Sequence, residues 1–235
     1  MKRSLTAFDR LAKTTGGSGF ADVFACSKFP TFEVPLVLAT KESLRGFGDV
    51  IEKESDVSKF MKNSTWPKTD GWRRISSGTG NEQLPTVGTF SHYWSGSVCH
   101  ADNSAVSRSY KIGIATTTSS SPPRRSVLAR ELNYHPCGSQ CIYPRSSAPF
   151  VALLGSVSSG RHPDDVGPGD LRAFLFGGAG APMMGLCIPA GVWHQPVYAV
   201  NESFECLDMQ SSVHACVVVD TIDEWGVALN VPLSL

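Results

Sequence analysis

A tight turn that leads to a histidine constrains the fold of this chain more than any other feature of its sequence. The apolar run at residues 185–188 ends at Pro189-Ala190-Gly191, and a proline followed closely by a glycine favours a tight turn. His194 stands three positions after Gly191. The pattern predicts a buried strand, a reversal of the chain, and then a short segment that carries an imidazole.

The rest of the chain has the pattern of an all-β domain. Glycine (22 residues) and proline (15 residues) are frequent, and the apolar segments between them are short, as in folds with many turns. A short helix followed by a strand is expected at residues 40–52. Strands are expected at residues 32–38, 90–99, 109–115, 127–132, 140–144, 150–154, 171–176, 185–188, 195–200, 204–209 and 215–220. Strands at this spacing indicate a barrel or a sandwich.

A length of 235 residues suffices for one sizeable core. Residues 1–33 lack clear periodicity and are interpreted as an N-terminal extension, which leaves residues 34–235 as a single domain. Two segments have the composition of exposed loops. The first, at residues 116–126, is rich in Ser and Thr, and the second, at residues 155–170, is long enough to form a rim or lid.

Charge and cysteine content narrow the classes of partner and compartment. Lys plus Arg and Asp plus Glu both total 21, so the net charge is zero and nothing favours nucleic acid or an anionic membrane. No apolar run approaches the roughly 18 residues of a membrane span. The seven cysteines form no CxxC pair, which is typical of reduced thiols in a cytoplasmic protein.

A second polar cluster precedes the turn and its histidine. His135 and Gln140 flank a turn that contains Pro136 and Gly138, so their side chains meet if both residues belong to strands of one barrel. Asn133 lies two residues before His135 and therefore on the same face of its strand. We expect His194 to add a fourth group to this cluster.

The two segments together resemble the two halves of the cupin signature. The usual residues of the first half are His, His and Glu, where this chain has Asn133, His135 and Gln140, and His194 belongs to the second half. The resemblance implies a cupin-like double-stranded β-helix, or jelly-roll, barrel with a few short helices. Such a pocket is similar to a site for a divalent metal ion, such as nickel, zinc or manganese, with His135, Gln140 and His194 as ligands.

Two further residues are candidates for substrate binding. Arg172 alternates with apolar neighbours, so it either points inward to a carboxylate or forms an exposed salt bridge. Trp193 either contacts the substrate or forms the barrel wall. Glu131 is interpreted as a solvated strand end.

Several separate motifs are similar to those of the ureidoglycolate lyases. They are found at residues 41–52, 131–140, 170–174 and 193–196, and the most specific are His-Pro-x-Gly-Ser-Gln and Trp-His-x-Pro. The resemblance implies a cupin-like homodimer that converts ureidoglycolate to glyoxylate and urea in allantoin (purine) degradation. It also implies that His135, Gln140 and His194 are the catalytic residues. The chain departs from the family at Asn133, where a glutamate is usual. The position of an arginine that is common upstream in the family falls in the loop at residues 116–121, where this chain has only Thr and Ser.

The chemistry of the candidate residues suits this reaction. Ureidoglycolate is a hemiaminal, so its carbon–nitrogen bond breaks when the hydroxyl loses a proton and the ureido nitrogen gains one. Histidine performs both transfers near pH 7. Two other classes stay open: a cupin-fold protein that binds a small carboxylate without catalysis, and another metal-dependent cupin enzyme such as an isomerase or dioxygenase.

Overall fold

Two β-sheets make up most of the protein, of which the computed structural model describes residues 22–78, 80, 82, 85–116, 124–178 and 180–235. The strand order of the larger sheet is β1 (Thr31–Glu33), β18 (Ala228–Pro232), β8 (Ser126–Ala129), β7 (Arg108–Ala115), β6 (Val98–Asn103), β5 (Thr86–Ser95), β16 (Ser203–Gln210), β10 (Gln140–Pro144), β13 (Gly185–Ile188) and β3 (Asp49–Ile51). The smaller sheet contains β2 (Leu36–Leu38), β12 (Leu171–Phe176), β11 (Phe150–Gly155), β14 (Trp193–His194), β9 (Glu131–Tyr134), β17 (Ala215–Asp220) and β4 (Ile75–Ser77), and β15 (Tyr198–Ala199) pairs with β11.

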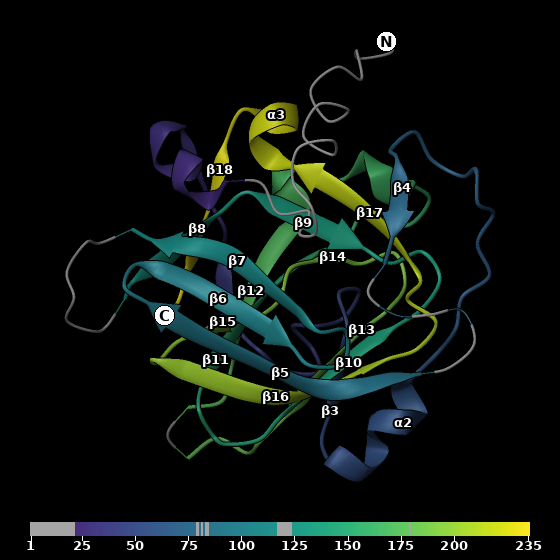
Figure 1. Ribbon diagram of the computed structural model, residues 1–235, viewed down its shortest axis with the longest axis horizontal. Helices are drawn as coiled ribbons and strands as arrows, with labels where there is room; N and C mark the ends of the chain where they lie inside the picture. Colours follow the sequence, from purple (N-terminus) through teal and green to yellow (C-terminus); the bar gives the residue numbers. More distant parts are fainter. Residues whose placement is uncertain (1–21, 79, 81, 83–84, 117–123, 179) are drawn as a thin grey trace.

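The sheets form the walls of a cupin-like barrel. Figure 1 shows β5, β6, β7 and β16 of the larger sheet in front of the fainter β11 and β12 of the smaller sheet. Large apolar side chains fill the space between the sheets, and the fully buried ones include Phe150, Phe174, Phe176 and Tyr198. The all-β fold expected from the alternating pattern is therefore confirmed.

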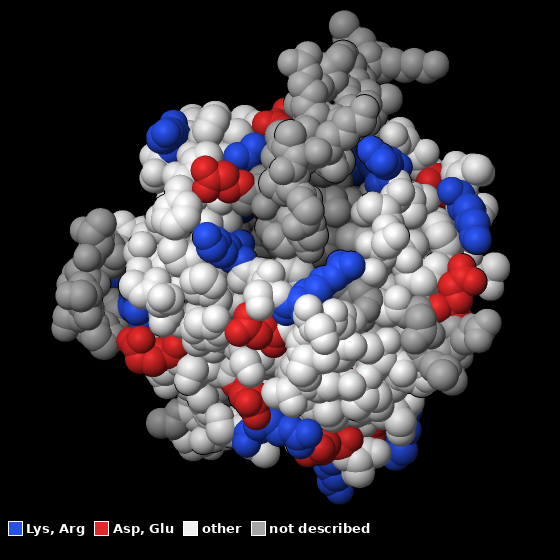
Figure 2. Space-filling model, viewed as in Figure 1, with Lys and Arg blue, Asp and Glu red and all other residues white. Residues whose placement is uncertain are grey.

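Helices are short and lie at the ends and edges of the sheets. They are η1 (Val23–Lys28), η2 (Glu54–Asp56), α2 (Val57–Phe60), η3 (Pro163–Asp165), η4 (Pro168–Asp170) and α3 (Thr221–Trp225). Within the described part of the chain, none of the helices has the length and apolar character that a membrane span requires. Figure 2 shows Lys and Arg side chains interspersed with Asp and Glu on the visible face.

The expected turn after β13 is present. Gly191 has a φ of +83°, which residues other than glycine rarely adopt. This backbone conformation lets the chain reverse from β13 into β14. The helix expected at the start of residues 40–52 is reduced to a run of turns. Its main-chain bond from Leu44 N to Thr40 O is helical, but Gly46, with a φ of +87°, ends the segment before β3.

The folded part of the chain begins earlier than residue 34. Strand β1 pairs in parallel with β18, with Thr31 opposite Ala228, and Cys26 of η1 is fully buried. Residues 1–21 of the expected extension lie outside the described residues, as do residues 117–123 of the expected loop at 116–126.

The segment at residues 155–170 is packed against the barrel. Its Asp164 is buried and accepts hydrogen bonds from the main-chain N of Trp72 and Arg73 and from the hydroxyl of Tyr134. These bonds attach the segment to two other parts of the chain, so it is held against the barrel, and none of its residues lines the cavity described below.

Candidate active site

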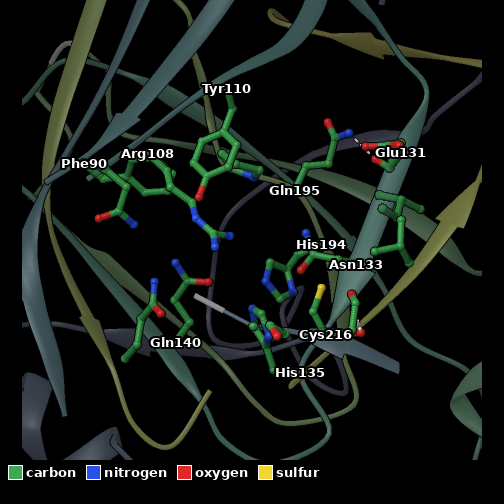
Figure 3. A pocket seen from close by; sticks show the side chains of 18 of the residues that line it. Phe90, Arg108, Tyr110, Glu131, Asn133, His135, Gln140, His194, Gln195 and Cys216 are labelled. Atoms are coloured by element: carbon green, nitrogen blue, oxygen red, sulfur yellow. Dashed lines mark hydrogen bonds between the residues drawn. The ribbon is translucent and has the colours of Figure 1, made fainter. Parts of the chain in front are cut away.

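A cavity of about 140 Å³ lies between the two sheets at the strands that carry the sequence motifs. The larger sheet contributes Asn103, Arg108, Tyr110, Gln140 and Gln210. The smaller sheet contributes Glu131, Asn133, His194 and Cys216, and His135 follows the end of β9. Figure 3 shows the two histidines across the cavity from Gln140. The described residues thus place His135, His194, Gln140 and Asn133 in one cavity, as the sequence predicts.

The two histidines form a close pair with a defined tautomer. Their ring centroids are 5.2 Å apart. His135 Nδ1 lies 2.8 Å from the carbonyl oxygen of Ala215, and His194 Nδ1 lies 2.9 Å from that of Val192. A carbonyl oxygen only accepts hydrogen bonds, so each Nδ1 carries the proton and each neutral ring keeps a lone pair on Nε2.

Burial keeps both rings neutral. It lowers the pKa of His135, and the bond to the Ala215 carbonyl only partly opposes this effect. Burial, together with the positive charge that His135 would carry, lowers the pKa of His194 to about 3. At neutral pH the pair therefore offers two proton acceptors and no imidazolium donor.

Gln140 belongs to a cluster of amides on the opposite wall. Its Nε2 donates to Asp208 Oδ1 at 2.7 Å, and Asn103 Nδ2 and Gln210 Nε2 each donate to Asp208 Oδ2 at 2.8 Å. Asp208 is fully buried, which raises the pKa of its carboxyl, and the three amide donors oppose that rise. These contacts fix the direction of each amide.

Asn133 stands next to the histidine pair. It is directly opposite His194 in the pairing of β9 with β14. Its Oδ1 is buried and has no hydrogen-bond partner among the described residues. Asn133 therefore presents an acceptor oxygen beside the two imidazoles, which supports its expected role in binding substrate.

Arg108 is a cavity residue that the sequence motifs do not reveal. It begins β7, directly opposite Asn103 of β6, and Figure 3 shows its guanidinium reaching into the cavity beside Tyr110. Burial raises the pKa of Tyr110, and the positive charge of Arg108 partly offsets this. The alternation of β7 was the available signal, because Arg108 shares a face with the buried residues Tyr110 and Ile112.

Arg172 and Trp193, expected among the substrate-binding residues, do not line the cavity. Strand β11 lies between β12, which carries Arg172, and β14 of the histidine pair, and the Arg172 guanidinium donates to the carbonyls of Gly169 and Leu171. Trp193 precedes His194 on β14 and therefore faces the other side of the sheet. It is fully buried, with its Nε1 donating to the carbonyl of Pro163 at 2.8 Å.

Glu131 also differs from its expected place. Instead of being a solvated strand end, it is 5% exposed and lines the cavity. Glu131 lies two residues before Asn133 on β9 and therefore on the same inward face of the strand, which places it inside the barrel.

Comparison with known proteins identifies the family. Residues 32–228 match the family model for ureidoglycolate lyase. The chain belongs to the ureidoglycolate lyase family. A ureidoglycolate lyase of Pseudomonas paraeruginosa is 30% identical over 180 residues, which cover 75% of this chain and 83% of the relative. The similar enzyme of Stutzerimonas stutzeri is 29% identical with the same coverage, and that of Brucella anthropi is 25% identical over 168 residues, 72% of this chain and 76% of the relative.

The cavity offers a metal ion two imidazole nitrogens and one neutral amide oxygen as candidate ligands. No cluster of three His, Cys, Asp or Glu side chains suited to a metal exists among the described residues. However, both Nε2 lone pairs are available because each Nδ1 is bound to a carbonyl, an arrangement common for metal-binding histidines. Gln140 directs its Nε2 to Asp208, which leaves its Oε1 as a neutral third donor.

Proposed function

We propose that the protein is a ureidoglycolate lyase that cleaves ureidoglycolate to glyoxylate and urea in the cavity between the two sheets. Membership of the family supports this reaction, and the observation that carries it is the neutral histidine pair with both Nε2 atoms available. The cavity also provides a cation, Arg108, and amide oxygens, which match the carboxylate and the ureido group of the substrate.

The reaction moves one proton from oxygen to nitrogen. The hydroxyl of the hemiaminal carbon gives up its proton, the carbon–oxygen bond becomes the aldehyde of glyoxylate, and the carbon–nitrogen bond breaks as the ureido nitrogen gains a proton to form urea. Because His135 and His194 both start as neutral acceptors, the proton delivered to nitrogen is the one removed from the hydroxyl. One imidazole therefore acts first as base and then as acid.

The low pKa of the pair favours the second transfer. A buried imidazolium readily gives up its proton, which assists departure of a poor leaving group such as a ureido nitrogen. Arg108, whose guanidinium reaches into the cavity from the wall opposite the histidines, binds the substrate carboxylate.

A divalent ion such as nickel, zinc or manganese defines the alternative form of the proposal, in which the same two Nε2 atoms hold the ion instead of moving the proton. His135 and His194 would hold it through Nε2, with Gln140 Oε1 beside them. When bound, the ion would polarise the substrate oxygens and lower the pKa of the hydroxyl. Asn133, where the family usually has a glutamate, would leave such a site with one negative charge fewer.

The remaining expectations follow the family. The substrate is a small molecule, and the expected homodimer and cytoplasmic location remain predictions. Gel filtration with light scattering measures the first, and cell fractionation measures the second.

The proposed activity is tested by product analysis. Purified protein is incubated with racemic ureidoglycolate, and glyoxylate, urea and ammonia are measured in the same sample. Equal amounts of glyoxylate and urea without ammonia are expected. Release of ammonia would show a hydrolase, and binding of ureidoglycolate without any product would favour the binding protein. Oxygen consumption with stoichiometric metal would favour a dioxygenase.

A further inference from the structure

A buried carboxylate behind the cavity wall controls the direction of the amides that face the cavity. Asp208 is fully buried and is not among the residues that line the cavity, yet three cavity residues from three strands bind it: Asn103 of β6, Gln140 of β10 and Gln210 of its own strand β16. The reaction described above does not use this carboxylate.

We propose that Asp208 is a positioning residue that makes Gln140 a hydrogen-bond acceptor toward the cavity, and that this acceptor recognises the N–H groups of the ureido end of the substrate. The inference rests on the proposed function. A carboxamide is nearly symmetric in shape, so packing alone does not decide which end faces a ligand. A carboxylate decides it, because its oxygens accept from the amide nitrogen and turn the amide oxygen away.

The two ends of the substrate differ in hydrogen-bonding character. The ureido group ends in an NH₂ and contains a second N–H, whereas the carboxylate offers only acceptors. The Gln140 oxygen therefore suits the ureido end, and the Arg108 guanidinium suits the carboxylate end. Asp208, which touches neither end, thereby sets the orientation in which the substrate faces the histidine pair.

The hydrogen bonds to Asp208 predict which neighbouring side chain rotates when Asp208 is replaced by asparagine. In the isosteric Asp208→Asn variant, one carboxylate oxygen is replaced by NH₂, which must face either Gln140 or the Asn103–Gln210 side. Asn103 cannot turn, because its Oδ1 already accepts from the main-chain N of Ala105 at 2.9 Å. The new NH₂ therefore faces Gln140, and Gln140 rotates to direct its own NH₂ into the cavity.

The test measures the affinity of each product separately. For Asp208→Asn we expect urea to bind at least about tenfold more weakly, since an acceptor is replaced by a donor. Glyoxylate, bound through Arg108, should keep its affinity or bind more tightly. Dissociation constants come from calorimetry and from product inhibition, on the protein as purified and after chelator treatment, so that any metal effect is separated.

A swapped pair provides the matched control. In the double variant that combines Asp208→Asn with Gln140→Glu, the introduced carboxylate accepts from the introduced amide and again directs an oxygen into the cavity. Urea affinity should return to within a few-fold of wild type, while the negative charge, now on the cavity wall instead of behind it, weakens glyoxylate binding. A role in stability alone would weaken both products together and would not be reversed by the swap.

The outcomes separate this inference from the proposed function. If the wild-type protein releases glyoxylate and urea, unchanged urea affinity in Asp208→Asn would overturn the positioning role and leave the lyase activity standing. A wild-type protein that releases neither product would overturn the proposed function itself. If Asp208→Asn does not fold, Gln140→Met decides, because it removes the acceptor and leaves Asp208 bound to Asn103 and Gln210. Unchanged urea affinity in that variant would also overturn the inference.

Discussion

Replacing Arg108 with glutamine should weaken substrate binding far more than it slows the chemical step. The guanidinium reaches into the cavity and is the cation proposed to bind the substrate carboxylate. A hydrogen bond to a charged group contributes about 1.5 to 3 kcal/mol. Because Arg108 is an exposed residue, solvent screening places the expected loss in the lower half of this range. KM should therefore rise roughly ten- to fortyfold, with kcat within about threefold.

The assay is steady-state release of glyoxylate, with glyoxylate inhibition measured on the same preparations. Arg172→Gln is the matched control, because Arg172 lies outside the cavity and its guanidinium contacts main-chain carbonyls. That variant should keep the wild-type KM. Equal KM values for Arg108→Gln and wild type, or an equal rise in both variants, would refute the assignment of Arg108 as the carboxylate anchor.

Three further predictions concern pH, metal and packing. Burial lowers the pKa of His92 and of His194 to about 3, so between about pH 6.5 and that value the unfolded chain binds more protons than the folded one. The free energy of unfolding in guanidinium should therefore fall as pH drops below about 6.5, by roughly 1 kcal/mol per pH unit for each ring; a flat profile from pH 7.5 to 5 would contradict the buried neutral state. Chelator distinguishes the two roles of the histidine pair: if the pair holds an ion, chelator should lower turnover and nickel, zinc or manganese should restore it, whereas full turnover of metal-free protein would leave the pair as base and acid. Trp193→Phe loses the bond to Pro163 and should unfold about 1 to 3 kcal/mol more easily with KM unchanged; a changed KM would indicate that Trp193 contacts substrate.

The fold was predictable in class because the signals that define it are local. Alternating apolar residues between turn residues predicted an all-β domain, and Pro189-Ala190-Gly191 predicted the turn into β14. The strand expected at residues 32–38 is divided in the structure between the two sheets, as β1 and β2, because each half pairs with a different strand. Strand β1 itself has only three residues, which carry almost no periodic signal. It exists because it pairs with β18 near the other end of the chain, and only the assembled sheet shows that pairing.

The candidate site was predictable where residue type and spacing form a motif. His135, Gln140 and His194 were found in this way, and the structure brings them to one cavity. Arg108 has no motif, although extending the expected strand at 109–115 by one residue would have placed it on the inward face. Asp208 was not accessible to this reasoning, because a buried carboxylate is tolerated only with partners, and its partner Asn103 lies 105 residues away in sequence.

The rate of glyoxylate release by a His194→Asn variant tests most directly whether the histidine pair moves the proton. Asparagine keeps a polar side chain of similar reach but cannot take up the hydroxyl proton, and general acid–base catalysis contributes about 10² to 10⁴ in rate. We expect a fall in kcat of at least about a hundredfold, with the melting temperature and glyoxylate affinity close to wild type. A folded variant that turns over ureidoglycolate within a few-fold of the wild-type rate would contradict the proposal that the histidine pair moves the proton.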